Sequence, residues 1–264
     1  MSDIVISAAF EACRANSRPA LIPYVTAGYP TRTSTFQVLK ALANHGADVI
    51  ELGIPFSDPL ADGPTIQKAS FISLENGTTV EGVLEDLRVF REHSDIPVVL
   101  FTYLNPVLRY GVTSFLADAE AAGANGLLMT DLPSGSDPEL ESEMISSPLD
   151  LIRLVAPTTP LDRVPGVANG GSGFLYYISR TGVTGTRSKL RDELKGEVTS
   201  IKGVVGMPVA VGFGISTGEQ AAAAGAVADG VVVGSAIIRA LEKGGVAEAS
   251  QFLATLRSAL DGPS

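Results

Sequence analysis

Two acidic residues, Glu51 and Asp62, lie close together in a segment that begins as an apolar strand and continues as a loop. Glu51 is surrounded by residues typical of a buried strand, and no basic residue lies near it in the sequence. Burying an unpaired carboxylate is costly, so this glutamate is either paired with side chains of a neighbouring strand or functional. An acid at the end of a buried strand, followed by a second acid on the next loop, is how an α/β enzyme positions a proton donor. The pair therefore indicates proton-transfer chemistry.

The strand that carries Glu51 is one of eight short apolar segments expected to be strands. They span residues 20–26, 48–53, 97–103, 126–131, 149–156, 174–179, 208–212 and 230–234. Near-continuous Val, Ile and Leu without alternation is typical of parallel strands covered on both faces. Helix-like stretches lie between them, at 34–45, 79–93, 113–122, 188–202 and 218–224. This alternation predicts a (β/α)₈ TIM barrel formed as a single domain by residues 1–264, with a flexible tail at 261–264.

Composition excludes several classes of function. A net charge of −10 and a pI near 4.7 argue against binding to nucleic acid or an anionic membrane surface, since both need clustered basic residues. The apolar runs are too short to span a bilayer. One cysteine, Cys13, excludes an internal disulfide, and no charged-then-apolar leader opens the sequence, so a cytoplasmic location is expected.

Two of the expected loops, at 55–67 and 182–189, are longer than the other connections between strands and helices. Long loops at the carboxyl ends of barrel strands usually serve the site. Glycine-bearing segments follow the last three expected strands, at 182–185, 212–216 and 234–236, with Ser235 as the expected helix N-cap. Each glycine alone could be a simple turn former, but their convergence at consecutive strand ends predicts a phosphate site built from backbone N–H groups.

The segment from Glu51 to Gln67 resembles the signature of the tryptophan synthase alpha chain family. It contains Pro-Phe-Ser-Asp-Pro at 55–59 and Ala-Asp-Gly-Pro at 61–64. The resemblance extends to residues 22–28, 179–185 and 234–236, and it implies the same barrel fold. It also implies the family's alpha reaction in tryptophan biosynthesis, the retro-aldol cleavage of indole-3-glycerol phosphate to indole and D-glyceraldehyde 3-phosphate.

The resemblance implies a role for each acid. Glu51, with its pKa raised by desolvation, is expected to protonate the indole ring carbon and then to act as base on the glycerol hydroxyl. Asp62 is expected to stay ionised and to stabilise the positive charge of the protonated ring. Tyr176 matches a family tyrosine near the active acid and is expected to bond the substrate or Glu51, although it could also be a core tyrosine with a satisfied hydroxyl.

Further residues are candidates for holding the substrate. Apolar walls for the indole could come from Tyr24, Phe101, Leu128 and Phe213, with Tyr103 and Asp131 nearby, or these could be ordinary barrel filling. By resemblance, Gly185, Gly214, Gly234 and Ser235 are expected to hold the phosphate, and Thr184 is a further candidate for binding the substrate. Asp58, between the two acids, is more typical of a turn.

Other aldolase chemistries lack their residues in this chain. All six lysines fall in helix-like or loop stretches, where no Schiff base would be held, and the two histidines, His45 and His93, close helices and cannot form a metal cluster. We expect no metal and no cofactor on this chain. The resemblance implies pyridoxal phosphate on a partner beta subunit, which would face the segment that contains Pro55 and the loop 105–110 in an alpha2beta2 assembly.

Three alternatives remain open. A phosphosugar isomerase would share the fold and the phosphate site, but its base glutamate would follow the sixth strand, where this chain has Ser179-Arg180-Thr181. A weakly catalytic activator of the beta subunit would have no need of both acids. A stand-alone lyase that releases free indole would carry the same catalytic residues.

Overall fold

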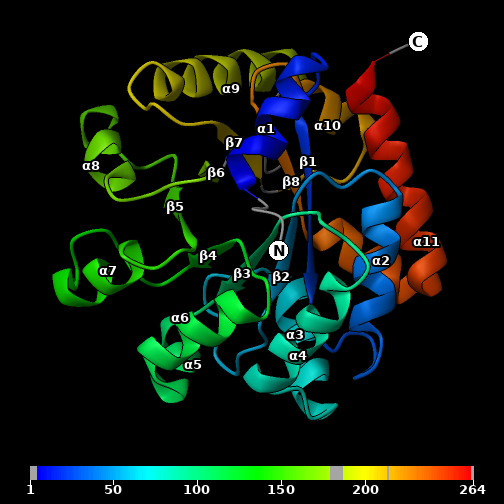
Figure 1. Cartoon of the computed structure of the whole chain (residues 1–264). Coiled ribbons are helices and arrows are strands. Elements are labelled where there is room, and N and C mark those ends of the chain that lie inside the picture. The colour runs from blue at the N-terminus through cyan, green and yellow to red at the C-terminus, as the bar shows by residue number, and fades with distance from the viewer. Residues whose placement is uncertain (1–4, 179–186, 213, 263–264) are drawn as a thin grey trace.

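Eight parallel strands close into a barrel in the computed structural model, which describes residues 5–178, 187–212 and 214–262 (Figure 1). Each strand pairs with the next in chain order, and β8 pairs with β1. The strands are β1 (Ala20–Thr26), β2 (Ile50–Gly53), β3 (Val98–Thr102), β4 (Gly126–Met129), β5 (Asp150–Val155), β6 (Leu175–Ile178), β7 (Val209–Gly212) and β8 (Gly230–Val233). The predicted (β/α)₈ barrel is confirmed, and every observed strand lies within an expected one.

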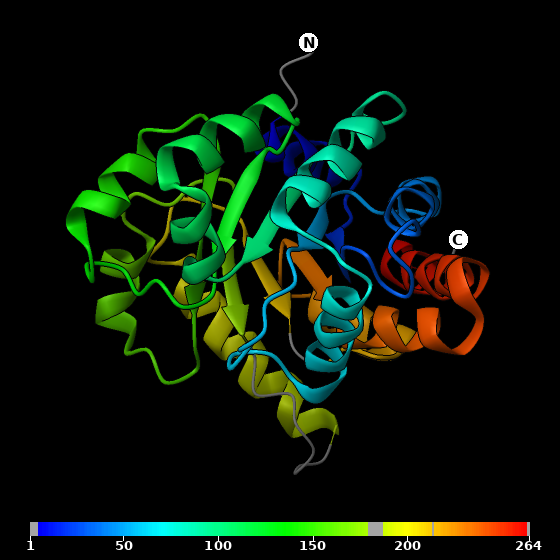
Figure 2. The same ribbon diagram turned by 90° about the horizontal axis from the view of Figure 1, so that it is seen from below.

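Helices surround the barrel (Figure 2). They are α1 (Ile6–Ala15), α2 (Thr35–Asn44), α3 (Pro64–Glu75), α4 (Val80–Arg91), α5 (Leu104–Tyr110), α6 (Val112–Ala121), α7 (Pro138–Ile145), η1 (Leu161–Arg163), α8 (Val164–Ala168), α9 (Arg187–Lys202), α10 (Gly218–Gly225) and α11 (Ser235–Asp261). The five expected helix-like stretches coincide with α2, α4, α6, α9 and α10. No helix within the described ranges is long and apolar enough to cross a membrane.

Alternate positions along the strands divide the core into two layers. One set of buried side chains packs between the strands and the surrounding helices. The other set fills the barrel interior and includes Ile22, Val99, Leu128 and Ile152. This alternation follows from the period-2 geometry of a strand. Inward side chains higher in the barrel, towards the carboxyl ends of the strands, are therefore placed to line a site.

Helix α1 packs against the interior layer. Its buried Ile6 and Phe10 belong to the interior cluster, and the Phe10 ring lies 5.4 Å from that of Phe174. Phe10 also comes close to Gly230, the first residue of β8. The amino-terminal end of the barrel is thereby filled with apolar side chains, and the open end lies at the carboxyl termini of the strands.

Two helix starts differ from the sequence-based expectations. The long loop expected at 55–67 ends earlier, because α3 begins at Pro64, where the missing N–H and fixed φ of proline suit the first helical position. Ser235 is the first residue of α11 and not its N-cap; Gly234 is the N-cap, and its carbonyl accepts hydrogen bonds from the N–H groups of Ile237 and Ile238. Asp261, which was expected to belong to a flexible tail, is the last residue of α11.

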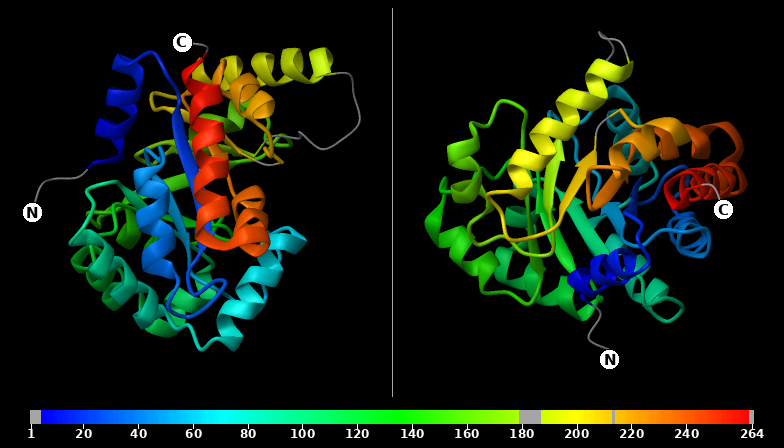
Figure 3. Two further views of the ribbon diagram at one scale, coloured as in Figure 1. Left: turned by 90° about the vertical axis from the view of Figure 1, so that its right-hand side faces the viewer. Right: turned by 90° about the horizontal axis from the view of Figure 1, so that it is seen from above.

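Helices α3 and α11 both contact β1 on the outside of the barrel. Lys68 of α3 forms an ion pair with Glu242 of α11, and α11 also runs beside α2 along the outside of the barrel (Figure 3, left). Gly244 and Gly245 have non-helical backbone angles, so α11 consists of two helical segments joined by a kink. The first of these segments starts directly after β8, at the rim of the barrel.

Candidate active site

Glu51 lies in the middle of β2 with its side chain buried. It is 1% exposed, and its Oε1 atom has no hydrogen-bond partner. Desolvation by burial raises its pKa to about 8. A carboxyl group with such a pKa is mostly protonated at neutral pH and can donate a proton. The sequence left open a glutamate paired with neighbouring strand side chains, and the unpartnered Oε1 weighs against that interpretation.

Asp62 lies on the loop between β2 and α3 and is partly buried. Burial raises its pKa to about 6, and interaction with the Tyr103 hydroxyl partly offsets that effect. With that pKa, the ionised form of Asp62 predominates at neutral pH. The environments of the two acids separate their pKa values in the sense needed for one proton donor and one fixed negative charge.

Two tyrosines, Tyr24 of β1 and Tyr176 of β6, flank the acids. Burial and the charges of Glu51 and Asp62 raise the pKa of each phenol, so both hydroxyls lie within electrostatic reach of both carboxylates. Among the described residues, no hydrogen bond joins Tyr176 to Glu51. The structure therefore brings Tyr176 to the acids, and a bond to the substrate remains a prediction.

Glycines on the next strands leave space for both tyrosines. A Cβ atom at Gly53 would lie 2.2 Å from the Tyr24 hydroxyl oxygen, and one at Gly212 would lie 2.3 Å from that of Tyr176. Neither distance is possible without displacement of the ring. Each tyrosine hydroxyl thus occupies the place of a side chain that the neighbouring strand lacks.

The residues expected to form apolar walls differ in their burial. The Tyr24 and Phe101 rings meet edge to face with centroids 5.1 Å apart, and Phe101 is only partly buried. Leu128 is fully buried in the interior cluster with Val99 and Ile152. Tyr24 and Phe101 can therefore line a cavity near the rim, whereas the Leu128 side chain is packed within the interior cluster.

The start of α11 lies beside this wall. A Cβ atom at Gly234 would be 3.5 Å from both Ile66 and the Cβ of Tyr24. The first N–H groups of a helix have no acceptor within the helix, so the first turn from Ser235 offers donors to an anion. Gly214 follows the neighbouring strand β7 with a φ of +77°, which suits glycine. Three predicted residues, Thr184, Gly185 and Phe213, lie outside the described residues.

The other polar candidates serve local structure. Asp58 is exposed and accepts a hydrogen bond from the Ser57 hydroxyl at 2.6 Å, in agreement with a turn. Asp131 accepts a hydrogen bond from the backbone N–H of Leu104 at 2.7 Å and so holds the start of α5. All six lysines lie within helices, and no group of three or more metal-ligating side chains occurs in the described part of the chain.

Two residues contact the Asp62 loop: Tyr103, which the sequence placed only near the walls of the indole site, and Gln67, to which the sequence gave no role. The Tyr103 hydroxyl lies 3.0 Å from the backbone nitrogen of Ala61, and the Gln67 side-chain amide lies 3.0 Å from the carbonyl oxygen of Asp62. Tyr103 follows a barrel strand, as site residues often do, and this was the available signal. Gln67 sits inside the family-like segment but carried no chemical indication.

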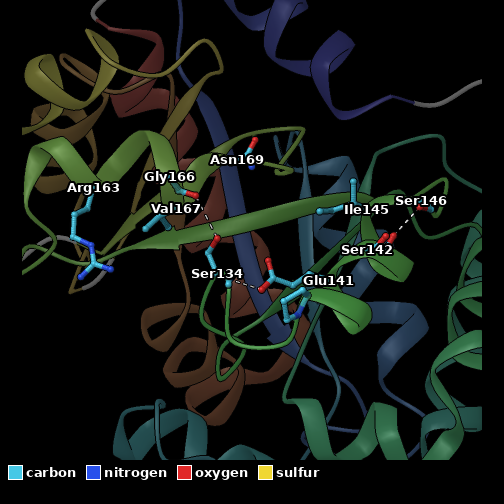
Figure 4. Close-up of a pocket in the computed structure, with 11 residues that line it drawn as sticks. Ser134, Glu141, Ser142, Ile145, Ser146, Arg163, Gly166, Val167 and Asn169 are labelled. Atoms are coloured by element: carbon cyan, nitrogen blue, oxygen red, sulfur yellow. Dashed lines mark hydrogen bonds between the residues drawn. The ribbon is translucent and has the colours of Figure 1, made fainter.

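A cavity of about 590 Å³ lies outside the barrel, between α7 and α8 (Figure 4). Its walls include Ser134, Glu141 and Arg163, and none of the predicted site residues lines it. Glu141 forms an ion pair with Arg153 at 2.5 Å and also accepts the N–H of Gly135. These contacts join α7 to β5 and to the loop that precedes α7.

Comparison with known proteins gives one consistent result. The family model described as tryptophan synthase alpha chain matches residues 10–260. A tryptophan synthase alpha chain from Citrifermentans bemidjiense is 47% identical over 255 residues, covering 97% of this chain and 96% of the relative. One from Gluconacetobacter diazotrophicus is 50% identical over 238 residues, covering 90% and 87%.

Solved structures agree with the sequence relatives. The crystal structure of tryptophan synthase subunit alpha from Legionella pneumophila superposes with a TM-score of 0.90 at 36% identity and covers 98% of both chains. A chain of Mycobacterium tuberculosis tryptophan synthase gives a TM-score of 0.89 at 37% identity, again with 98% of both chains covered.

Proposed function

The chain belongs to the tryptophan synthase alpha chain family, and on that premise we propose that Glu51 and Asp62 together carry its reaction. The alpha reaction cleaves indole-3-glycerol phosphate to indole and D-glyceraldehyde 3-phosphate, and it is the reaction of this chain. The chain is accordingly a lyase of tryptophan biosynthesis. The observation that supports the catalytic assignment best is the buried Glu51 carboxyl group with its unpartnered Oε1.

Glu51 acts as general acid and then as general base. Protonated at neutral pH because its pKa is about 8, it donates a proton to the indole carbon that bears the glycerol phosphate. The positive charge that forms on the ring weakens the bond between that carbon and the side chain. As the bond breaks, the Glu51 carboxylate takes the proton of the adjacent glycerol hydroxyl, which becomes the aldehyde, and the acid is regenerated.

Asp62 stabilises the charge formed in the first step. Its carboxylate accepts a hydrogen bond from the indole N–H, which becomes more acidic when the ring is protonated, so the interaction is stronger in the transition state than in the ground state. Tyr176 donates to the substrate near Glu51. Tyr24 and Phe101 pack against the indole ring, with Phe213 as a further wall.

The phosphate lies at the start of α11, with Gly234 and Ser235 on one side and Gly214 on the other. Adjacent strands β7 and β8 bring these two segments together, and the free N–H groups of the first turn of α11 support the assignment. Thr184 and Gly185 complete the phosphate end in the proposal.

No cofactor is needed for this chemistry. The two acids supply the proton transfer, and lysines confined to helices support the absence of a Schiff base at a strand end. We propose further that residues 1–264 form one domain and that the protein acts in the cytoplasm, in keeping with a single buried cysteine.

Membership of the family implies a beta-subunit partner, and we propose an alpha2beta2 assembly. Exposed apolar side chains on the loop after β2 and on α5, the helix that the structure has in place of the loop expected at 105–110, support a docking surface at the open end of the barrel. Leu60, after β2, is 89% exposed, and Leu108, after β3, is 54% exposed. Large apolar side chains left in water at one face are typical of an interaction site.

Turnover of indole-3-glycerol phosphate by the purified chain, alone and with a tryptophan synthase beta subunit, tests the proposal. We expect slow release of indole that rises strongly with the partner. Fast release without the partner would instead identify a stand-alone lyase, and no release in either case would favour an activator without catalysis. Glu51→Gln should abolish cleavage while phosphate binding, followed by thermal shift, is kept; normal turnover by this variant would refute the acid assignment.

A further inference from the structure

The loop that carries Asp62 is held from two sides by side chains of other elements. Residues 54–63 connect β2 to α3, and the loop contains a turn in which the N–H of Asp62 donates to the carbonyl of Pro59 at 3.0 Å. A loop at the rim of a barrel has few backbone partners of its own. Its geometry therefore depends on the side chains that contact it.

Tyr103 contacts the loop from the end of β3. Its hydroxyl accepts the N–H of Ala61 at 3.0 Å, its ring lies 5.3 Å from that of Phe56, and the residue is 4% exposed. A phenol that accepts one hydrogen bond still has its own proton to donate. Asp62 is the carboxylate beside it, and the two groups perturb each other's pKa.

Gln67 contacts the loop from the first turn of α3. Its side-chain amide donates to the carbonyl of Asp62 at 3.0 Å and to that of Pro59 at 3.3 Å. The two NH₂ protons of a glutamine can serve two such acceptors at once. The backbone on both sides of the Pro59–Asp62 turn is thus joined to a rigid helix.

We propose that Tyr103 and Gln67 are positioning residues for Asp62 in the cleavage of indole-3-glycerol phosphate. Tyr103 fixes the backbone of Ala61, the residue before Asp62, through its hydroxyl, and Gln67 fixes the backbone carbonyl of Asp62 itself. The inference rests on the proposed role of Asp62. It predicts that both residues affect the rate constant of the chemical step more than the binding of substrate, because the charge that Asp62 stabilises exists only in the transition state.

Tyr103→Phe tests the first half, since it removes the hydroxyl and keeps the ring against Phe56. The Tyr103 hydroxyl lowers the pKa of Asp62, so its loss should raise that pKa, and we expect kcat to fall roughly tenfold at pH 6 and less at pH 8, with little change in KM. The titration of the Asp62 carboxyl carbon, assigned by NMR with Asp62→Asn, should move to higher pH in the same variant.

The two readouts separate the possible failures. An unchanged Asp62 titration in Tyr103→Phe would overturn the positioning role of Tyr103, whatever the activity. A titration that moves while the pH dependence of kcat does not would keep the contact and refute the catalytic role of Asp62. Unfolding temperature is measured in parallel, because a merely structural effect lowers stability without moving the titration.

Gln67→Leu tests the role of Gln67 and is compared with two further variants, Gln67→Lys and Gln251→Leu. Gln67→Leu loses both donated hydrogen bonds and should lower kcat about two- to fivefold at unchanged unfolding temperature. Gln67→Lys keeps a donor at this position and should recover part of the loss. Gln251→Leu, on the exposed face of α11, is the matched control and should leave kcat unchanged. Equal kcat for all three variants and the parent chain would overturn the role of Gln67.

Discussion

Tyr24 and Glu51 are register partners in the ladder between β1 and β2, so a phenol and a carboxyl group start from the same level of the barrel. The Tyr24 ring reaches over Gly53 and meets Phe101, and its hydroxyl pairs with that of Thr26 at 3.2 Å. The Tyr24 and Phe101 rings therefore lie beside the Glu51 carboxyl group and limit its access to water. This arrangement explains why burial alone raises the pKa of Glu51.

The pH dependence of kcat/KM should be bell-shaped. Asp62 must be ionised, which places the acid limb near its pKa of about 6, and Glu51 must be protonated, which places the basic limb near about 8. In Asp62→Asn the acid limb should disappear from the residual activity while the basic limb stays. A profile of Asp62→Asn with both limbs unchanged would contradict this assignment of groups.

Glu51→Gln should make the folded protein more stable at alkaline pH. The folded-state pKa of Glu51, about 8, lies above its ordinary value of 4.5, so its contribution to stability is fully present below pH 4.5 and is lost as pH rises through 8. Glutamine has no charged form and escapes this loss. The unfolding temperature of Glu51→Gln should exceed that of the parent chain by several degrees at pH 9 and match it near pH 4.5; a lower value at pH 9 would argue against a desolvated acid.

Gly212→Ala should impair cleavage by displacing Tyr176. The added Cβ would lie 2.3 Å from the Tyr176 hydroxyl oxygen, and such overpacking costs about 1–3 kcal/mol or moves the ring. We expect a fall in kcat of at least tenfold. Gly206→Ala is the control, because a Cβ there meets nothing within 4 Å. Equal activity of the two variants would mean that the place of the Tyr176 hydroxyl is unimportant.

The sequence predicted the barrel well because its strands are encoded locally. Each expected strand is a short run of apolar residues that the barrel buries on both faces, so composition and position agree. The start of α3 was missed because Pro64 looks like part of a loop in sequence but suits the first turn of a helix. Ser235 was expected to be the N-cap on residue type alone. The N-cap is Gly234, whose carbonyl accepts the first hydrogen bonds of α11.

The site was predictable only in part, for a physical reason. The resemblance located Glu51 and Asp62, and the burial of Glu51 followed from its apolar neighbours. The contact of Tyr103 with the Asp62 loop joins residues 42 positions apart and depends on how β3 lies beside β2. The space that Gly53 leaves for the Tyr24 ring likewise depends on how β1 and β2 pair. Neither has a local signal in the chain.

Ser235→Asp should weaken binding of substrate much more than Ser235→Ala. If backbone N–H groups at the start of α11 hold the phosphate, loss of the serine hydroxyl matters little, whereas a carboxylate there repels the anion. We expect KM for indole-3-glycerol phosphate to rise at least tenfold in Ser235→Asp and less than threefold in Ser235→Ala. Thermal shift with inorganic phosphate provides the second measurement, and equal shifts for both variants would place the phosphate elsewhere.

Helix α1 gives the barrel a sealed base. Ile6 and Phe10 are packed into the amino-terminal end and close it. Substrate and products must therefore pass through the open end, at the carboxyl termini of the strands. In the proposed mechanism, indole would form beside Glu51 and the phosphate-bearing product would lie at the start of α11, so both would leave through the same opening. A partner docked on Leu60 and Leu108 would lie beside that opening. It would therefore control the release of both products.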